Sequence, residues 1–259
     1  MINARDDTPR RASHAVLVYH RIGPRAGPPD SLCTFVEQFA AQMRYLVEMG
    51  FRPVPPGGGA GPAPRSIAIT FDDGYLDAYT TAFPLLERMG LTATVFLVSG
   101  CVGTTSGGWG PRTPAPLMTW SQIREMQRHG ISFQSHTRTH ADLRQRTDAA
   151  ALHELAASRA EIEDRLGAQV DAVAYPFGSF DSRISELAER AGYTSGWAAG
   201  LAAGAPLSGE RFEITAKDTM ATFAVKASGW GGWLRRARAH LRGDLRSSGP
   251  PGGMGVKPC

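Results

Sequence analysis

The chain has 259 residues, of which 42% are hydrophobic and 20% are charged. This composition can bury a sizeable core and does not indicate disorder, and the length is ordinary for a single α/β barrel. The formal net charge is only +4, and no basic patch is interleaved with aromatic residues, so nothing indicates nucleic-acid binding.

The ends of the chain differ in composition from its middle. Residues 1–13 are polar and contain no apolar stretch, so they do not predict a secretory signal, and no apolar run is long enough to cross a bilayer. Three scattered cysteines, Cys33, Cys101 and Cys259, indicate reduced thiols and not a disulfide framework. We therefore expect a cytoplasmic protein with a flexible N-terminus (1–13), a catalytic domain (14–228) and a poorly ordered basic Gly/Pro-rich tail (229–259).

The predicted elements alternate between strands and helices. The first part of the chain contains a strand at 14–19, a helix from Thr34 (capped with Glu37) to Gly50, and strands at 51–54 and 66–70. A helix ending at Gly90, a strand at 92–98, a helix from Thr119 (capped with Gln122) to Gly130 and a strand at 131–135 follow. The last part contains a helix at 148–166 stopped by Gly167, a strand at 170–175, a helix at 182–191 and strands at 193–197 and 211–215. This order predicts a mostly parallel sheet with helices outside it, open or closed into a barrel.

The residues with chemical potential fall at or just after the carboxyl ends of these strands, which is where barrels carry their active sites. The first such segment is Thr70-Phe-Asp-Asp-Gly74. One of its adjacent carboxylates can bind a cation while the other acts as a base, and Gly74 allows the sharp turn that exposes both. Taken alone, Asp-Asp-Gly is more often a turn with Asp capping the next helix.

The second segment is Ser135-His-Thr-Arg-Thr-His140. On a helical turn, histidines four residues apart face the same side, a common way to chelate zinc. The alternative is a pair of surface histidines. Two histidines and one aspartate would leave coordination positions open for water and substrate, as in catalytic metal sites.

The third segment, Ala174-Tyr-Pro-Phe-Gly178, follows a strand. Its proline and glycine predict a tight loop whose backbone N–H groups face the cleft. An ordinary strand-to-helix turn is the alternative.

Together the three segments resemble the polysaccharide deacetylase family, also called the NodB-homology group or carbohydrate esterase family 4. The resemblance covers about residues 14–228 and includes Val18-Tyr-His-Arg-Ile22 and Ala93-Thr-Val-Phe96. It implies an α/β fold, a distorted (β/α) barrel with fewer than eight parallel strands. It also implies a divalent metal, typically zinc, with cobalt or nickel as alternatives, and an acetylated amino sugar as substrate.

The resemblance also implies roles for individual residues. Asp73, His136 and His140 would be the metal ligands, and Asp72 would be the general base that takes a proton from the attacking water. The backbone N–H of Phe177, in the loop that begins at Tyr175, would stabilise the oxyanion.

Two features depart from the common family pattern. Ala174 occupies the position at which many members carry an arginine that orients the base, and a late Leu-x-His that supplies the general acid is missing, since only His240 follows His153. A subset similar to the deacetylases of exported poly-N-acetylglucosamine shares Tyr-His near the N-terminus and Tyr-Pro-Phe-Gly in the third segment. By that resemblance His20 is the candidate for the acid or a substrate contact; the alternative is a structural histidine bonded to a loop carbonyl.

The sequence thus predicts a metal-dependent hydrolase that removes N-acetyl groups from an N-acetylhexosamine glycan or glycoconjugate. Trp109, in a Gly-rich loop, is the best candidate to stack on a sugar face. A deacylase of a small non-polymeric substrate, such as a glycosylated natural product, and a glycan-binding pseudoenzyme are the alternatives. Polymeric and small substrates are both compatible with the sequence, which does not indicate an oligomeric state.

Overall fold

The computed structural model describes residues 14–25, 32–57, 65–107, 109, 114–200 and 205–229. The expected flexible N-terminus, 1–13, lies outside these residues, and so does the expected tail apart from Gly229.

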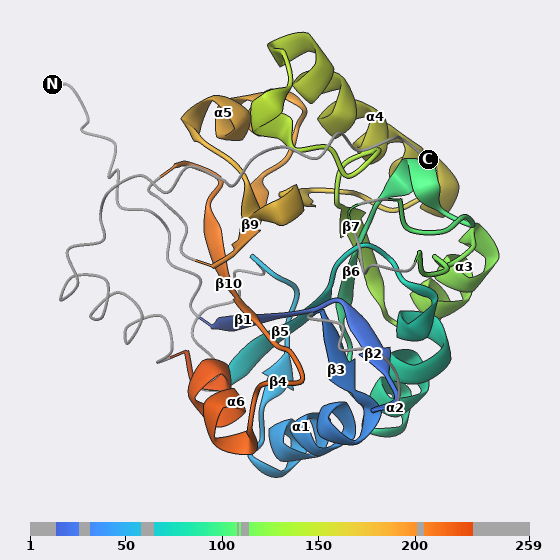
Figure 1. Ribbon diagram of the computed structural model, residues 1–259, viewed down its shortest axis with the longest axis vertical. Coiled ribbons are helices and arrows are strands. Elements are labelled where there is room, and N and C mark those ends of the chain that lie inside the picture. The colour runs from blue at the N-terminus through green and yellow to red at the C-terminus, as the bar shows by residue number, and fades with distance from the viewer. Residues whose placement is uncertain are drawn as a thin grey trace, which may run out of the picture.

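Within the described residues, seven parallel strands close into a barrel (Figure 1). They are β1 (Ala15–Tyr19), β5 (Ser66–Phe71), β6 (Thr94–Leu97), β7 (Ser132–Ser135), β8 (Ala172–Ala174), β9 (Ser195–Ala199) and β10 (Gly209–Glu213). The barrel closes because β1 pairs with both β5 and β10. The short strand β4 (Arg52–Pro53) is added beside β5, while β2 (Arg21–Gly23) and β3 (Cys33–Phe35) form a separate parallel pair. The predicted barrel with fewer than eight strands is confirmed.

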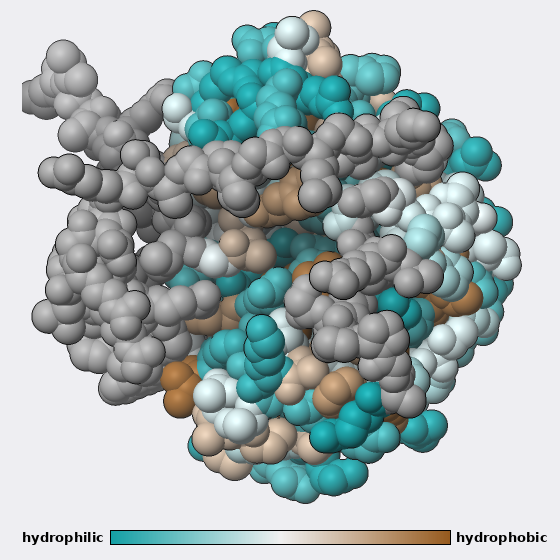
Figure 2. All heavy atoms as spheres, in the orientation of Figure 1, coloured by the Kyte–Doolittle hydropathy of each residue, from teal (hydrophilic) through white to brown (hydrophobic). Residues whose placement is uncertain are grey.

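Helices surround the barrel on its outside (Figure 1). They are α1 (Val36–Glu48), α2 (Phe83–Arg88), α3 (Trp120–Arg128), α4 (Asp148–Leu166), α5 (Ser182–Arg190) and α6 (Met220–Ala227), with single turns at Ala78–Ala82, Ser99–Cys101, Leu143–Gln145 and Pro176–Gly178. Hydrophilic residues dominate the surface where α4 and α5 lie, at the top of Figure 2. No helix among the described residues is long and apolar enough to cross a membrane.

The two faces of the barrel wall carry different side chains. Along β1, Ala15, Leu17 and Tyr19 belong to the large cluster that also contains the buried helix residues, whereas Val16 belongs to a second cluster. That second cluster draws on β1, β5, β6, β8 and β9, which identifies it as the barrel interior; its members are Val16, Ala68, Phe96, Ala172, Ala174 and Trp197. The three alanines are small, which leaves interior space for larger side chains.

Helix starts and stops follow the predicted signals with two exceptions. The Thr119 hydroxyl caps α3 together with Gln122, and α4 ends at Gly167, which has φ 60°. The first helix, however, begins at Val36 and not Thr34, because Thr34 belongs to strand β3, and the N-cap position falls on Phe35.

The other exception is the helix predicted to end at Gly90. It consists of two parts, a π-helical turn at Ala78–Ala82 followed by α2, with Pro84 in the first turn of α2. Proline lacks the N–H that a continuous helix would need at that position.

The cysteines differ from the expectation of reduced thiols. Cys33 is a thiol whose Sγ donates to the Thr34 carbonyl, but Cys101 is disulfide-bonded. The expectation is therefore wrong for Cys101.

Candidate active site and metal centre

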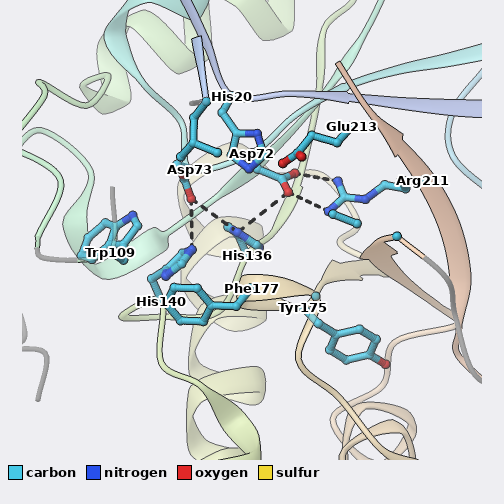
Figure 3. A pocket seen from close by; sticks show the side chains of 14 residues that line it. His20, Asp72, Asp73, Trp109, His136, His140, Tyr175, Phe177, Arg211 and Glu213 are labelled. Atoms are coloured by element: carbon cyan, nitrogen blue, oxygen red, sulfur yellow. Dashed lines mark hydrogen bonds and ion pairs between the residues drawn. The ribbon is translucent and has the colours of Figure 1, made fainter. Parts of the chain in front are cut away.

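A pocket of about 520 Å³ opens at the carboxyl ends of the barrel strands. Figure 3 shows its side chains. Most of the residues singled out in the sequence line it; the full set is His20, Leu32, Asp72, Asp73, Trp109, His136, His140, Tyr175, Phe177, Gly178, Ala199, Gly200, Arg211 and Glu213. The parallel barrel thus gathers residues that are far apart in the sequence, as the strand-end argument predicts.

The two aspartates lie on a turn directly after β5. Asp73 and Gly74 both have left-handed backbones, with φ 69° and 80°, and the Asp72 N–H donates to the Tyr19 carbonyl at 2.9 Å. The next helical residues begin at Leu76, so neither aspartate is a helix cap and the alternative interpretation of this segment is wrong. Both carboxylates are buried and face the pocket.

The two histidines come from an irregular loop after β7, not from a helical turn. Thr137 and His140 have φ 66° and 57°, values that a helix does not contain. The helical-turn prediction is therefore wrong about the backbone, although the two imidazoles do come together, with ring centroids 4.8 Å apart. Threonine is β-branched and rarely adopts a left-handed backbone, so this loop is strained.

Asp73, His136 and His140 form a buried cluster that fits a divalent metal. Each offers one ligand atom, and these atoms all lie within 4.8 Å of one another. Asp73 Oδ1 lies 3.4 Å from His136 Nε2 and 3.2 Å from His140 Nε2, yet this buried oxygen makes no well-aligned hydrogen bond. A buried carboxylate oxygen without a hydrogen bond is costly, and a cation held by all three groups would remove that cost.

The hydrogen bond on the far side of His136 supports this arrangement. His136 Nδ1 lies 2.8 Å from the Ala174 carbonyl, so Nδ1 carries the proton and Nε2 is left to bind a metal. His140 has no such partner: its Nδ1 is buried and unbonded among the described residues.

Burial and charge shift the pKa values of these groups in different directions. Burial lowers the pKa of His140, which favours the neutral, ligating form. Burial opposes ionisation of Asp72 and Asp73, but Arg211 beside Asp72 and the two histidines beside Asp73 outweigh it, so the pKa of each carboxyl is lowered. For Asp72 the largest stabilising contribution is the charge of Arg211.

Arg211 is a site residue that the sequence analysis did not identify. It lies on β10, is fully buried, and donates from Nη1 and Nη2 to the two oxygens of Asp72, each at 2.6 Å. Its guanidinium carbon also lies 5.1 Å from the centroid of the Phe96 ring in the barrel interior. The base candidate therefore has an arginine partner, which comes from β10 and not from the position occupied by Ala174.

A signal for Arg211 was present in the sequence. The last strand is predicted at 211–215 but begins in the structure at Gly209, so Arg211 lies in the middle of β10. Phe212 and Ile214 pack in the outer core, so a period of two residues places Arg211 and Glu213 on the inner face. Both line the pocket.

Two aromatic side chains flank His140. Trp109 stacks on its ring with centroids 5.0 Å apart and an interplanar angle of 16°, and Phe177 meets it edge-on at 4.6 Å. Phe177 has φ 60° and remains 57% exposed, so its ring forms part of the pocket rim. Trp109 is 8% exposed, and its ring packs against His140, a candidate metal ligand.

Tyr175 and His20 are placed differently from each other. The Tyr175 ring points away from the aspartates (Figure 3), and its hydroxyl donates to the Leu207 carbonyl at 3.0 Å. His20 lies in the pocket beside Asp72 (Figure 3), and its buried Nδ1 has no hydrogen-bond partner in the described part of the chain. Among the described residues, no loop carbonyl therefore accepts a bond from His20 Nδ1.

Fold and site together define an α/β barrel with a candidate divalent-metal centre at its strand ends. The family model for polysaccharide deacetylases matches residues 59–196 of the chain, more than half of its length. YxkH of Bacillus subtilis is 30% identical over 196 residues, which cover 73% of this chain and 65% of that protein. The chain thus spans less than two thirds of the length of this relative.

Two solved structures have the same fold. BC0361, a polysaccharide deacetylase from Bacillus cereus, is 27% identical with a TM-score of 0.71, covering 82% of this chain and 68% of that chain. The deacetylase PplD of Streptococcus pyogenes is 24% identical with a TM-score of 0.72, covering 85% of this chain and 99% of that chain. The chain belongs to the polysaccharide deacetylase family.

Proposed function

We propose that this protein hydrolyses the N-acetyl group of an N-acetylhexosamine in a glycan or glycoconjugate, with a divalent metal, most simply zinc, at Asp73, His136 and His140. The observation that carries the proposal is one pocket that combines this buried ligand cluster with a second carboxylate. That carboxylate, Asp72, is held by Arg211 in its ionised form. Family membership supports the reaction class.

The chemistry divides between the metal and the chain. When bound, a divalent cation polarises the acetyl carbonyl and makes water a better nucleophile at neutral pH. Asp72 takes the proton of the attacking water, because its charge is maintained by Arg211 and its carboxylate faces the pocket. Hydrolysis adds water across the amide and gives acetate and a free amine.

The chain offers groups for the two remaining tasks. The backbone N–H of Phe177 is not among the donors of its own turn, which are Gly178 and Ser179, so it can stabilise the oxyanion. His20, beside Asp72, can donate a proton to the departing amine.

The proposed sugar follows from two segments of the sequence. The Tyr19-His20 pair and the Tyr175-Pro-Phe-Gly178 segment favour the subset that is similar to poly-N-acetylglucosamine deacetylases. The pocket is open to solvent at Phe177, which suits a residue within a longer chain as well as a small glycoconjugate. Comparing chain lengths of the same acetylated sugar separates the two.

Acetate release tests the proposal. Chitooligosaccharides and small N-acetylglucosaminides are incubated with the full chain, with and without a chelator, followed by addition of zinc, cobalt or nickel. We expect release that the chelator abolishes and metal restores. Absence of release from every acetylated sugar, by protein shown to contain metal, would contradict the proposal.

The same assay distinguishes the alternatives. A deacylase of another kind would prefer longer acyl groups or a non-sugar amide, and a glycan-binding pseudoenzyme would bind the oligosaccharides without releasing acetate. The Arg211–Asp72 pair weakens the pseudoenzyme alternative, because the base retains its arginine partner despite Ala174.

A further inference from the structure

One face of helix α4 is polar although it is turned toward the barrel. Glu154, Ser158 and Glu161 are spaced four and three residues apart, so they lie on the same side of the helix. Ser158 Oγ lies 2.8 Å from Ser135 Oγ at the end of β7, and Glu161 accepts from Ser99 Oγ at 2.8 Å, just after β6. This polar face therefore contacts the strand ends that carry the site.

Glu154 makes the most extensive of these contacts. Its Oε2 accepts the backbone N–H groups of Arg138 and Thr139 at 2.9 and 2.8 Å, and its Oε1 accepts the Thr139 hydroxyl at 2.7 Å. Residues 138 and 139 lie between the two histidines of the metal cluster. A single carboxylate thus holds the segment of backbone that joins both imidazole ligands.

The backbone just after β6 also holds the loop. The Ser99 N–H donates to the Thr137 carbonyl at 3.2 Å and the Gly100 N–H donates to the Arg138 carbonyl at 2.9 Å. The carbonyls of residues 137 and 138 are therefore bonded to the backbone after β6, and the N–H groups of residues 138 and 139 are bonded to Glu154. Because the loop lacks the internal hydrogen bonds of a helix and contains strained residues, these outside contacts fix its conformation.

We propose that Glu154 is a positioning residue for the metal centre. It holds the left-handed turn that brings His140 beside Asp73 and so sets metal affinity, without touching metal or substrate. The inference rests on the metal site of the proposed function. Groups that orient metal ligands through hydrogen bonds typically contribute about 10- to 100-fold to metal affinity.

The experiment measures the affinity of the metal-free full chain for zinc and cobalt, by competition with a chromophoric chelator and by the visible spectrum of bound cobalt. We expect Glu154→Ala to weaken affinity by about 10-fold or more and to alter the cobalt spectrum. Glu154→Gln should lose less, because an amide oxygen can accept both N–H groups while its nitrogen donates to the Thr139 hydroxyl. Asp164→Asn removes a charge from an exposed part of the same helix and should leave affinity unchanged.

A second pair of variants keeps the test decisive if Glu154→Ala does not fold. Thr139→Val removes only the hydroxyl contact and should weaken affinity, whereas Thr139→Ser retains that contact and should not. Wild-type affinity and spectrum in a folded Glu154→Ala variant, or in Thr139→Val, would overturn the inference. A wild-type chain that binds metal but releases no acetate would refute the proposed function and leave this inference intact.

Discussion

At the scale of single residues, the site separates two carboxylates that are adjacent in the chain. Asp73 is turned toward two imidazoles, whereas Asp72 is turned toward a guanidinium. The left-handed backbone of Asp73 produces this divergence. Neighbouring aspartates can therefore take different roles, one as a ligand and the other as a base.

The first prediction uses this division. Asp73→Asn should lose metal, because an amide oxygen is a much poorer ligand than a carboxylate, and should lose activity with it. Asp72→Asn should keep about one metal per chain but lose turnover by about 100-fold or more, the scale of general-base catalysis. Metal analysis and acetate release on both variants check this. Full turnover by Asp72→Asn would exclude Asp72 as the general base.

A second prediction concerns pH. A base works in its ionised form, so activity falls as the pH drops through its pKa, and Arg211 lowers the pKa of Asp72. In Arg211→Met that pKa rises, and the acid limb of the kcat/KM profile should move to higher pH. The variant should also lose about 3 to 5 kcal/mol of stability, because it leaves a buried charge without its partner.

The control for Arg211 is Arg211→Lys. It keeps the charge but cannot form two parallel hydrogen bonds to the carboxylate, so we expect an intermediate shift of the acid limb. An acid limb that does not move in Arg211→Met, in protein that remains folded, would show that Arg211 does not tune the base.

A third prediction concerns His20. If it protonates the departing amine, His20→Ala should lower kcat while metal content stays unchanged, and the loss should be smaller for substrates whose leaving amine needs less protonation. Kinetics with sugar acetamides and activated anilides compare the two. Full turnover of sugar acetamides by His20→Ala would exclude the acid role.

At the scale of elements, two packed segments determine where the histidines lie. Gly100 follows β6 and touches the histidine loop so closely that a Cβ there would lie 2.8 Å from the Arg138 carbonyl oxygen. Gly100→Ala should displace that loop and weaken metal affinity, even though it alters neither ligand. Gly130→Ala is unsuitable as a control, because it would itself strain a left-handed backbone. The control is Thr147→Ala, at the start of α4, which should cost about 1 kcal/mol of stability and leave metal affinity unchanged. Calorimetry and metal titration measure both effects.

The elements also show how far the sequence could predict this site. Strand ends placed Asp72, Asp73, His136 and Tyr175 at one rim because parallel strands share a direction. The loop that joins the histidines could not be predicted as irregular, because its shape depends on Glu154 from a distant helix and on the end of β6. The four-residue spacing of the histidines predicted the two imidazole ligands but not the backbone conformation that holds them.

At the scale of the whole molecule, barrel closure explains the residue that the sequence analysis missed. Arg211 meets Asp72 only because β10 pairs with β1, which in turn pairs with β5. The two residues are 139 positions apart, and no local pattern links them. The alternation of strands and helices did predict the fold class, whereas no local pattern predicts this long-range ion pair.

Whole-molecule stability should also report the metal. A ligand that binds only the folded chain stabilises it by about 2.7 kcal/mol at a free concentration 100 times its dissociation constant. Zinc should therefore raise the melting temperature of the wild-type chain but not that of Asp73→Asn. An equal rise in both would place the zinc elsewhere.

The most direct test of the account is a zinc titration of the metal-free full chain in which bound metal and acetate release from an N-acetylglucosamine oligosaccharide are measured in the same samples. We expect activity to rise in proportion to bound zinc and to saturate at about one ion per chain, the capacity of one Asp-His-His site. Acetate release that is already maximal without metal, or that is retained by Asp73→Asn, would contradict it.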